Sequence, residues 1–219
     1  MQMKTKLITT IVLAAALAGS GSMANAQKTT KLFNGKNLSN WSFVLQDNGA
    51  PAEQVFTVKN GLIHITGKPT GYMYTKEKYS NYKLHVEWRW PDGVESNSGI
   101  FLLITEALNP FPNGIECQLH AGDAGDYIAE GGSVLAEYKL APGEAHPKFM
   151  VVKKAGASSE NPAGQWNEAN IFVRGGVMTT FINGVYQNVG VTEQTEGHIG
   201  LQSEGNHIEF RNVTITPFD

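Results

Sequence analysis

The stretch "YKLHVEWRW", residues 82–90, decides the fold class because its apolar and polar residues alternate strictly. On an extended strand, successive side chains point to opposite faces of the sheet. One face would carry His85, Glu87 and Arg89. The other face would carry five large apolar or aromatic side chains, namely Tyr82, Leu84, Val86, Trp88 and Trp90. We therefore expect a long strand with one face in a hydrophobic core and one polar face.

Short segments of the same kind follow one another along the chain after about residue 30, and turn residues separate them. The dipeptides Asn60-Gly61 and Asn183-Gly184 are typical of two-residue hairpin turns. We count roughly eleven or twelve candidate strands with no helical pattern between them. This spacing predicts an all-β fold of two curved antiparallel sheets, a sandwich or jelly roll. Residues 131–165 contain three prolines and are expected to form long loops and an irregular strand.

The first 26 residues have the pattern of a secretory signal peptide. Lys4 and Lys6 precede a short apolar run, and Ala24-Asn25-Ala26 matches the small residues before a cleavage site. The apolar run is too short for a membrane span. We therefore expect cleavage after Ala26, a single jelly-roll domain over residues 27–219, and a periplasmic or secreted protein.

Charge and cysteine content narrow the class of partner. The chain has a net charge of −3 and no basic patch, so nucleic acid is not an expected partner. Cys117 is the single cysteine, which excludes an internal disulfide. Because it alternates with polar residues, we expect its thiol to be buried and unreactive.

A second polar strand face lies in "GIECQLHAGDAGDY", residues 114–127, where Glu116, Gln118 and His120 fall two residues apart. Such a face is either a solvated surface or the floor of a groove. Grooves that hold sugars use carboxylates, amides and aromatic rings, because hydroxyl groups need polar partners and pyranose C–H faces stack on rings. The turns around the candidate groove add four polar side chains that could contact a ligand: Asn97, Asp123, Gln202 and Glu204.

Several motifs together resemble the 3-keto-disaccharide hydrolase domain family, over about residues 31–217. They include "LFNGKNLSNW", "YKLHVEWRWP", "GIECQLHAGDAGDY", "FINGVYQN" and "GHIGLQSEGNHIEFRNVTI". The resemblance implies a concanavalin A-like jelly roll and a substrate that is a glycoside or disaccharide oxidised to a ketone at sugar carbon 3. It implies cleavage either by hydrolysis or by 1,2-elimination followed by hydration. The chain departs from the family pattern at Leu103 and His120, where relatives often carry His or Arg and Lys, respectively, so we expect Leu103 to remove a polar group from the groove.

Elimination next to a ketone needs a base, an acid and a positive or hydrogen-bonding group near the ketone oxygen. We expect Glu116 to act as general base or metal ligand and His120 as proton donor or metal ligand. Arg89 could stabilise the enolate. The remaining candidates for substrate positioning are Glu87, Asn97, Gln118, Asp123, Gln202 and Glu204. A divalent metal held by Glu116, His120 and a nearby Asp or His is possible, whereas His64 is expected to be a hydrogen-bonded structural histidine.

Three other classes remain open on the sequence alone. A non-catalytic carbohydrate-binding module would use the same groove without reacting. A laminarinase-type glycoside hydrolase would need two carboxylates on one strand face, which Glu116, Gln118 and His120 do not supply. A secreted structural or adhesion domain would leave the groove without a role. The sequence does not predict the oligomeric state.

Overall fold

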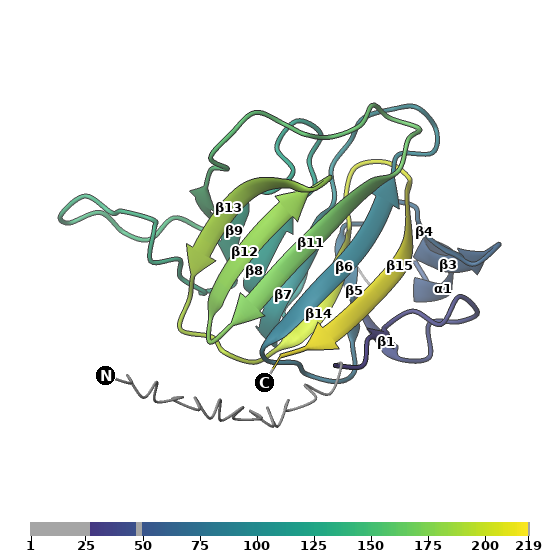
Figure 1. The fold of residues 1–219 in the computed structure, drawn as a ribbon, viewed down its shortest axis with the longest axis horizontal. Coiled ribbons are helices and arrows are strands. Elements are labelled where there is room, and N and C mark those ends of the chain that lie inside the picture. Colours follow the sequence, from purple (N-terminus) through teal and green to yellow (C-terminus); the bar gives the residue numbers. More distant parts are fainter. Residues whose placement is uncertain (1–26, 47–49, 219) are drawn as a thin grey trace, which may run out of the picture.

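The computed structural model describes residues 27–46 and 50–218, and in these residues the chain forms two stacked antiparallel sheets (Figure 1). The predicted all-β sandwich is therefore confirmed. The predicted signal peptide lies outside the described residues. In the part that the structure describes, no helix has the length and apolar character needed to cross a bilayer. The helix α1 (Ala52–Val55) is a single turn before β3.

The eight-stranded sheet faces the viewer in Figure 1 and contains the opening stretch of the sequence analysis. Its strand order is β13 (Val185–Val191), β12 (Val177–Ile182), β11 (Asn167–Arg174), β6 (Tyr82–Arg89), β15 (Ile208–Pro217), β4 (Leu62–Ile65) and β3 (Phe56–Lys59). The short strand β1 (Thr30–Lys31) also pairs with β15.

The seven-stranded sheet lies behind it (Figure 1). Its strand order is β10 (Met150–Val152), β9 (Tyr127–Glu130), β8 (Asn113–Gln118), β7 (Gly99–Glu106), β14 (His198–Ser203), β5 (Gly71–Thr75) and β2 (Trp41–Leu45). The strands β8 and β14 carry polar residues on their outward face and lie on either side of β7, although β14 comes from a distant part of the chain.

The alternation in residues 82–90 is confirmed residue by residue. Tyr82, Leu84, Val86 and Trp88 are fully buried between the sheets, and their neighbours in sequence are partly exposed on the outer face. From the seven-stranded sheet, Ile115, Cys117 and Leu119 enter the same core. Burial of this continuous apolar layer is what holds the two sheets together.

A bulge in β7 changes the direction of one side chain. Leu103 has a left-handed backbone with φ of 54°, and the pairing of β7 with β8 shifts in register between Leu102 and Glu106. Two consecutive leucines, Leu102 and Leu103, therefore both point into the core. The expectation that Leu103 removes a polar group from a groove is wrong, because its side chain does not face the outer surface.

Candidate functional site

Two glutamates meet on the outer face of the seven-stranded sheet. Glu116 on β8 is paired with Ile128 on β9, so Glu130, two residues further along β9, lies diagonally across from Glu116 on the same face. Their carboxyl groups are close enough to share a hydrogen bond when one of them is protonated. Glu116 is 2% exposed and Glu130 is 3% exposed, so the pair is almost sealed from bulk water.

Burial raises the pKa of both carboxyl groups. For Glu116 burial is the largest cause, and the negative charges of Glu130 and Glu204 raise its pKa further. For Glu130 burial raises the pKa to about 8, although the hydrogen bond from Glu116 and the positive charge of Lys148 act in the opposite direction. At neutral pH the two carboxyls therefore retain at least one proton between them.

Buried hydrogen-bond acceptors surround this pair. Oε1 of Glu116 and Oε2 of Glu130 have no hydrogen-bond partner among the described residues. Oε1 of Gln202 and Oδ1 of Asn97 are likewise buried without a donor in that part of the chain. Buried acceptors are normally satisfied, so such a group indicates a place for a ligand that brings hydroxyl groups or positive charge.

Glu204 connects the buried pair with the rim of the sheet. Its carboxylate accepts a hydrogen bond from the Asn97 side chain, and its charge acts on both Glu116 and Glu130. Burial raises the pKa of Glu204, while the Asn97 hydrogen bond and the nearby His120 ring partly offset that increase.

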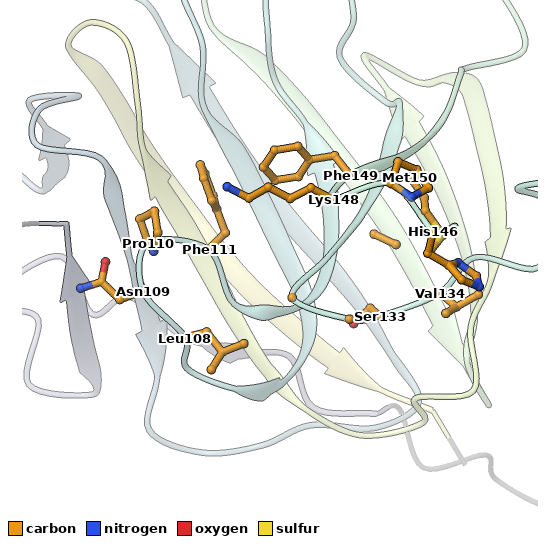
Figure 2. Close-up of a pocket in the computed structure, with 14 residues that line it drawn as sticks. Leu108, Asn109, Pro110, Phe111, Ser133, Val134, His146, Lys148, Phe149 and Met150 are labelled. Carbon is orange, nitrogen blue, oxygen red and sulfur yellow. The ribbon is translucent and has the colours of Figure 1, made fainter. Parts of the chain in front are cut away.

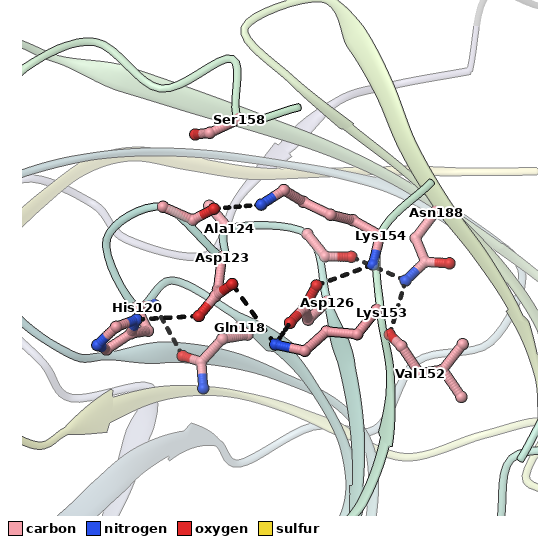
Figure 3. Close-up of polar contacts among 12 residues, drawn as sticks. Gln118, His120, Asp123, Ala124, Asp126, Val152, Lys153, Lys154, Ser158 and Asn188 are labelled. Atoms are coloured by element: carbon pink, nitrogen blue, oxygen red, sulfur yellow. Dashed lines mark hydrogen bonds and ion pairs between the residues drawn. The ribbon is translucent and has the colours of Figure 1, made fainter. Parts of the chain in front are cut away.

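His120 lies on the loop that follows β8, where its side chain is 53% exposed and contacts Asp123 at 3.2 Å (Figure 3). Strand β8 ends at Gln118. The backbone N–H groups of Leu119 and His120 donate to Oε1 of Gln118 at 2.9 and 2.8 Å, so the side chain holds the start of the loop. Buried Asp126 fixes the far end of the loop by accepting from the backbone N–H of Lys154 at 2.8 Å.

Aromatic rings flank the carboxyl pair on its other side. Tyr72, on β5, packs edge-on against Phe101 with 5.3 Å between ring centroids, and its hydroxyl donates to the carbonyl of Leu108 at 2.8 Å. Next to them a cavity of about 570 Å³ is lined mainly by apolar side chains, with Phe111, Lys148 and Phe149 grouped together (Figure 2). Ala129 and Gly131, the neighbours of Glu130 in sequence, line this cavity, whereas neither Glu130 nor Glu116 lines it.

Comparison with known proteins places this arrangement in a family. The model of the 3-keto-alpha-glucoside-1,2-lyase-like domain matches residues 28–216. The chain belongs to this family. A 3-keto-disaccharide hydrolase of Bacteroides thetaiotaomicron is 23% identical over 86% of this chain and 78% of its own length.

Solved structures support the fold of this 3-keto-alpha-glucoside-1,2-lyase-like chain. A Parabacteroides distasonis protein described as a candidate glycosyl hydrolase is 24% identical, with a TM-score of 0.62 over 87% of this chain and 94% of that one. A β-glucanase of Bacillus licheniformis is 13% identical, with a TM-score of 0.58 over 90% of this chain and 100% of the other. The predicted concanavalin A-like jelly roll is therefore confirmed, and these likenesses concern the fold alone.

Glu87 and Arg89 lie on the other sheet of the lyase-like domain. Both project from the outer face of β6 in the eight-stranded sheet, so the core separates them from Glu116. Arg89 contacts Glu209 at 2.6 Å, and Glu87 contacts Arg211 at 2.6 Å. The expectation that these two residues share a groove with Glu116 is wrong, because the polar faces of the two sheets point away from each other.

The other predicted residues lie on one side of the molecule but differ in depth. Glu116 and Gln202 are buried, Asn97 and Glu204 are partly buried next to them, and His120 is on the rim. The side-chain carbonyl oxygen of Gln118 accepts a hydrogen bond from the loop backbone. The carboxylate of Asp123 contacts His120 and Lys153. A ligand that bound to either group would have to replace these structural contacts.

Glu130 is the residue that sequence reasoning missed. The short segment "YIAE" precedes a glycine pair and was not recognised as a strand, although its alternation would place Ile128 and Glu130 on one face. The proposed metal group of Glu116 and His120 is also not assembled. In the part of the chain that the structure describes, the side chains that gather three metal-ligand atoms within 4.8 Å of one another are His64, His207 and Glu209, on the eight-stranded sheet.

Proposed function

We propose that this protein cleaves 3-keto-glycosides or 3-keto-disaccharides, and that the Glu116–Glu130 pair carries out the proton transfers. The single observation that carries the proposal is this buried carboxyl pair with raised pKa values, set among acceptors that lack donors. Membership of the lyase-like family and the relative named as a 3-keto-disaccharide hydrolase support the choice of substrate.

The chemistry follows from the ketone. A carbonyl at carbon 3 acidifies the hydrogen on carbon 2, and a carboxylate with a raised pKa is a stronger base than an ordinary one. Once the pair has lost one of its protons, which the pKa of Glu130 places at about pH 8, the resulting carboxylate removes the carbon-2 proton and the electrons of the C2–H bond form an enolate. The enolate then re-forms the ketone, a double bond forms between carbons 1 and 2, and the bond from carbon 1 to the glycosidic oxygen breaks. Addition of water to the product completes a net hydrolysis.

Each step assigns a task to a described residue. The protonated carboxyl of the pair can donate a hydrogen bond to the developing enolate oxygen. The exposed His120 ring is proposed to supply a proton to the departing oxygen. The unpaired oxygens of Gln202 and Asn97 would accept hydrogen bonds from sugar hydroxyl groups. The apolar cavity beside Glu130 would take the remainder of the glycoside, with Phe111 or Phe149 against its C–H faces.

A conventional glycosidase, retaining or inverting, fits this geometry less well. Its two carboxyl groups stand about 5–5.5 Å apart in retaining enzymes and about 6.5–9.5 Å apart in inverting enzymes, because the reacting sugar carbon lies between them. Glu116 and Glu130 are instead close enough to share a hydrogen bond when one of them is protonated. Two carboxyl groups this close can share one proton and can both act on the same side of a substrate.

The decisive test is a comparison of nitrophenyl glucoside with its 3-keto derivative, each with hydrogen or deuterium at carbon 2. We expect nitrophenol release from the keto compound alone, and slower release from its deuterated form. Release from the plain glucoside at a similar rate would instead favour a laminarinase-type reaction. Binding of either compound without release would identify a carbohydrate-binding module, and an equal rate for the deuterated compound would count against proton removal as the slow step.

A further inference from the structure

Three side chains with metal-ligand atoms converge on the outer face of the eight-stranded sheet, on the opposite side of the molecule from Glu116. His64 on β4 is paired directly with Glu209 on β15, and His207 precedes Glu209 by two residues. Nδ1 of His64 lies 3.2 Å from Nε2 of His207 and 3.3 Å from Oε1 of Glu209. All three ligand atoms lie within 4.8 Å of one another.

The outer hydrogen bonds of the two rings determine which nitrogen faces inward. Nε2 of His64 lies 3.3 Å from the carbonyl oxygen of Lys59, which can only accept, so this nitrogen carries the proton and donates it. Nδ1 of His207 in the same way donates to Oδ2 of Asp92 at 3.3 Å. The inward nitrogens, Nδ1 of His64 and Nε2 of His207, are then lone-pair acceptors that face each other.

Glu209 completes the group as a third acceptor. Its Oε2 accepts a hydrogen bond from Nε of Arg89 at 2.6 Å, which leaves Oε1 directed towards the histidines. Arg89 is in turn held over the ring of Trp166, with 4.7 Å from its guanidinium carbon to the ring centroid. Three converging lone pairs repel one another unless a proton or a metal cation lies between them.

We propose that His64, His207 and Glu209 bind a divalent transition-metal ion of the zinc class. Zinc holds imidazole nitrogens and carboxylate oxygens at about 2.0–2.2 Å in a tetrahedron, which places neighbouring ligand atoms about 3.4 Å apart. The two distances at His64, 3.2 and 3.3 Å, match this spacing. Lys59 and Asp92 supply the outer hydrogen bonds that metal-bound histidines characteristically make.

The ion would occupy a site with one open position. The side chains of His64 and His207 are 19% and 31% exposed, so water can reach the centre and fill the fourth coordination position. His207 and Glu204 lie at opposite ends of the same turn between β14 and β15, and this turn is also joined to Ser96 by the backbone N–H of Asn206 at 2.8 Å. By holding His207, a bound ion would therefore fix one end of the turn that carries Glu204.

The test uses the protein without any histidine tag, stripped with chelator and dialysed against Zn²⁺. We expect one Zn²⁺ per chain by elemental analysis, and a rise in Tm of about 5–10 °C at a concentration about 100 times Kd. Co²⁺ should give the visible absorption of a four-coordinate site. Asp92→Asn should weaken binding about 10–100-fold, because it removes the outer partner of His207.

Two variants and one matched control make the outcome decisive. His64→Ala and His207→Gln should each abolish stoichiometric binding and the Tm rise. Two separate variants are used so that poor folding of one still leaves the other as a test. His85→Ala, on the same outer sheet face but bonded to Asn170, should retain both. Absence of Zn²⁺ and Co²⁺ binding by the wild-type chain would overturn the proposal, as would full binding by both His64→Ala and His207→Gln.

Discussion

Gly99 lies directly beneath the carboxyl group of Glu116: a Cβ atom at position 99 would fall 2.0 Å from Oε1 of Glu116 and 2.7 Å from two further atoms of that side chain. The two residues come from neighbouring strands, since Gly99 pairs with Gln118 on β8. The absence of a side chain at this position is what lets Glu116 lie flat across β7.

Gly99→Ala should therefore lower activity without unfolding the protein. The backbone at Gly99 is not left-handed, so alanine fits the strand, but the Glu116 carboxyl must move aside. We expect kcat/KM on a 3-keto-glycoside to fall about 10–100-fold, because small displacements of a reacting group have effects of this size. Gly156→Ala, where a Cβ would meet open space, is the control. Full activity in Gly99→Ala would show that the position of Glu116 does not matter.

Replacing either member of the carboxyl pair tests the assignment of proton transfer. Glu116→Gln and Glu130→Gln should each reduce kcat/KM by about 100-fold or more, since general acid–base catalysis contributes about 10²–10⁴-fold. Both glutamines preserve the size of the side chain. Glu87→Gln, on the outer face of the other sheet, should leave the rate unchanged. If one pair variant kept the wild-type rate, that residue would be a structural neighbour of the base only.

The raised pKa of Glu130 predicts how stability depends on pH. The folded state holds the proton of this carboxyl up to about pH 8, whereas the unfolded chain releases it near 4.5. The folded state therefore binds more protons in this window, and stability is lost as pH rises through it. In thermal melts at pH 5 and pH 8, Glu130→Gln should flatten this loss by roughly 5 °C.

Glu87 provides a control of opposite sign for the same melts. Burial pushes its pKa up, but the hydrogen bonds from Asn212 and Arg211 together outweigh burial and hold the pKa below its usual value. Glu87→Gln should therefore leave the loss of stability between pH 5 and pH 8 as in the wild type. An unchanged pH profile in Glu130→Gln would mean that Glu130 ionises normally in the folded protein.

Cys117 should not react with thiol reagents while the protein is folded. Its side chain is fully buried between the sheets, and burial raises the pKa of the thiol to about 12. Because the thiolate is the reactive form, modification should be fast only after unfolding. Rates of labelling in buffer and in denaturant give the comparison. Rapid labelling of the native protein would indicate that the core opens at β8.

Strand periodicity predicted much of the fold and part of the site. It placed Cys117 in the core and Glu116 on an outer face, because alternation fixes which residues share a side. It could not tell which outer face Glu87 and Arg89 belong to, because both sheets have a polar outer face and only strand order separates them. Glu130 was missed because its strand has only four residues. Leu103 was placed on the wrong face because a bulge reverses the alternation there, and no residue in the sequence indicates this bulge.

The proton held between Glu116 and Glu130 also changes how the whole molecule behaves in an electric field. The sequence pI of about 6.1 and the formal charge of −3 treat both carboxyl groups as ionised at neutral pH. The folded chain carries less negative charge than that, so native isoelectric focusing should resolve it at a more alkaline position than the same polypeptide focused in urea.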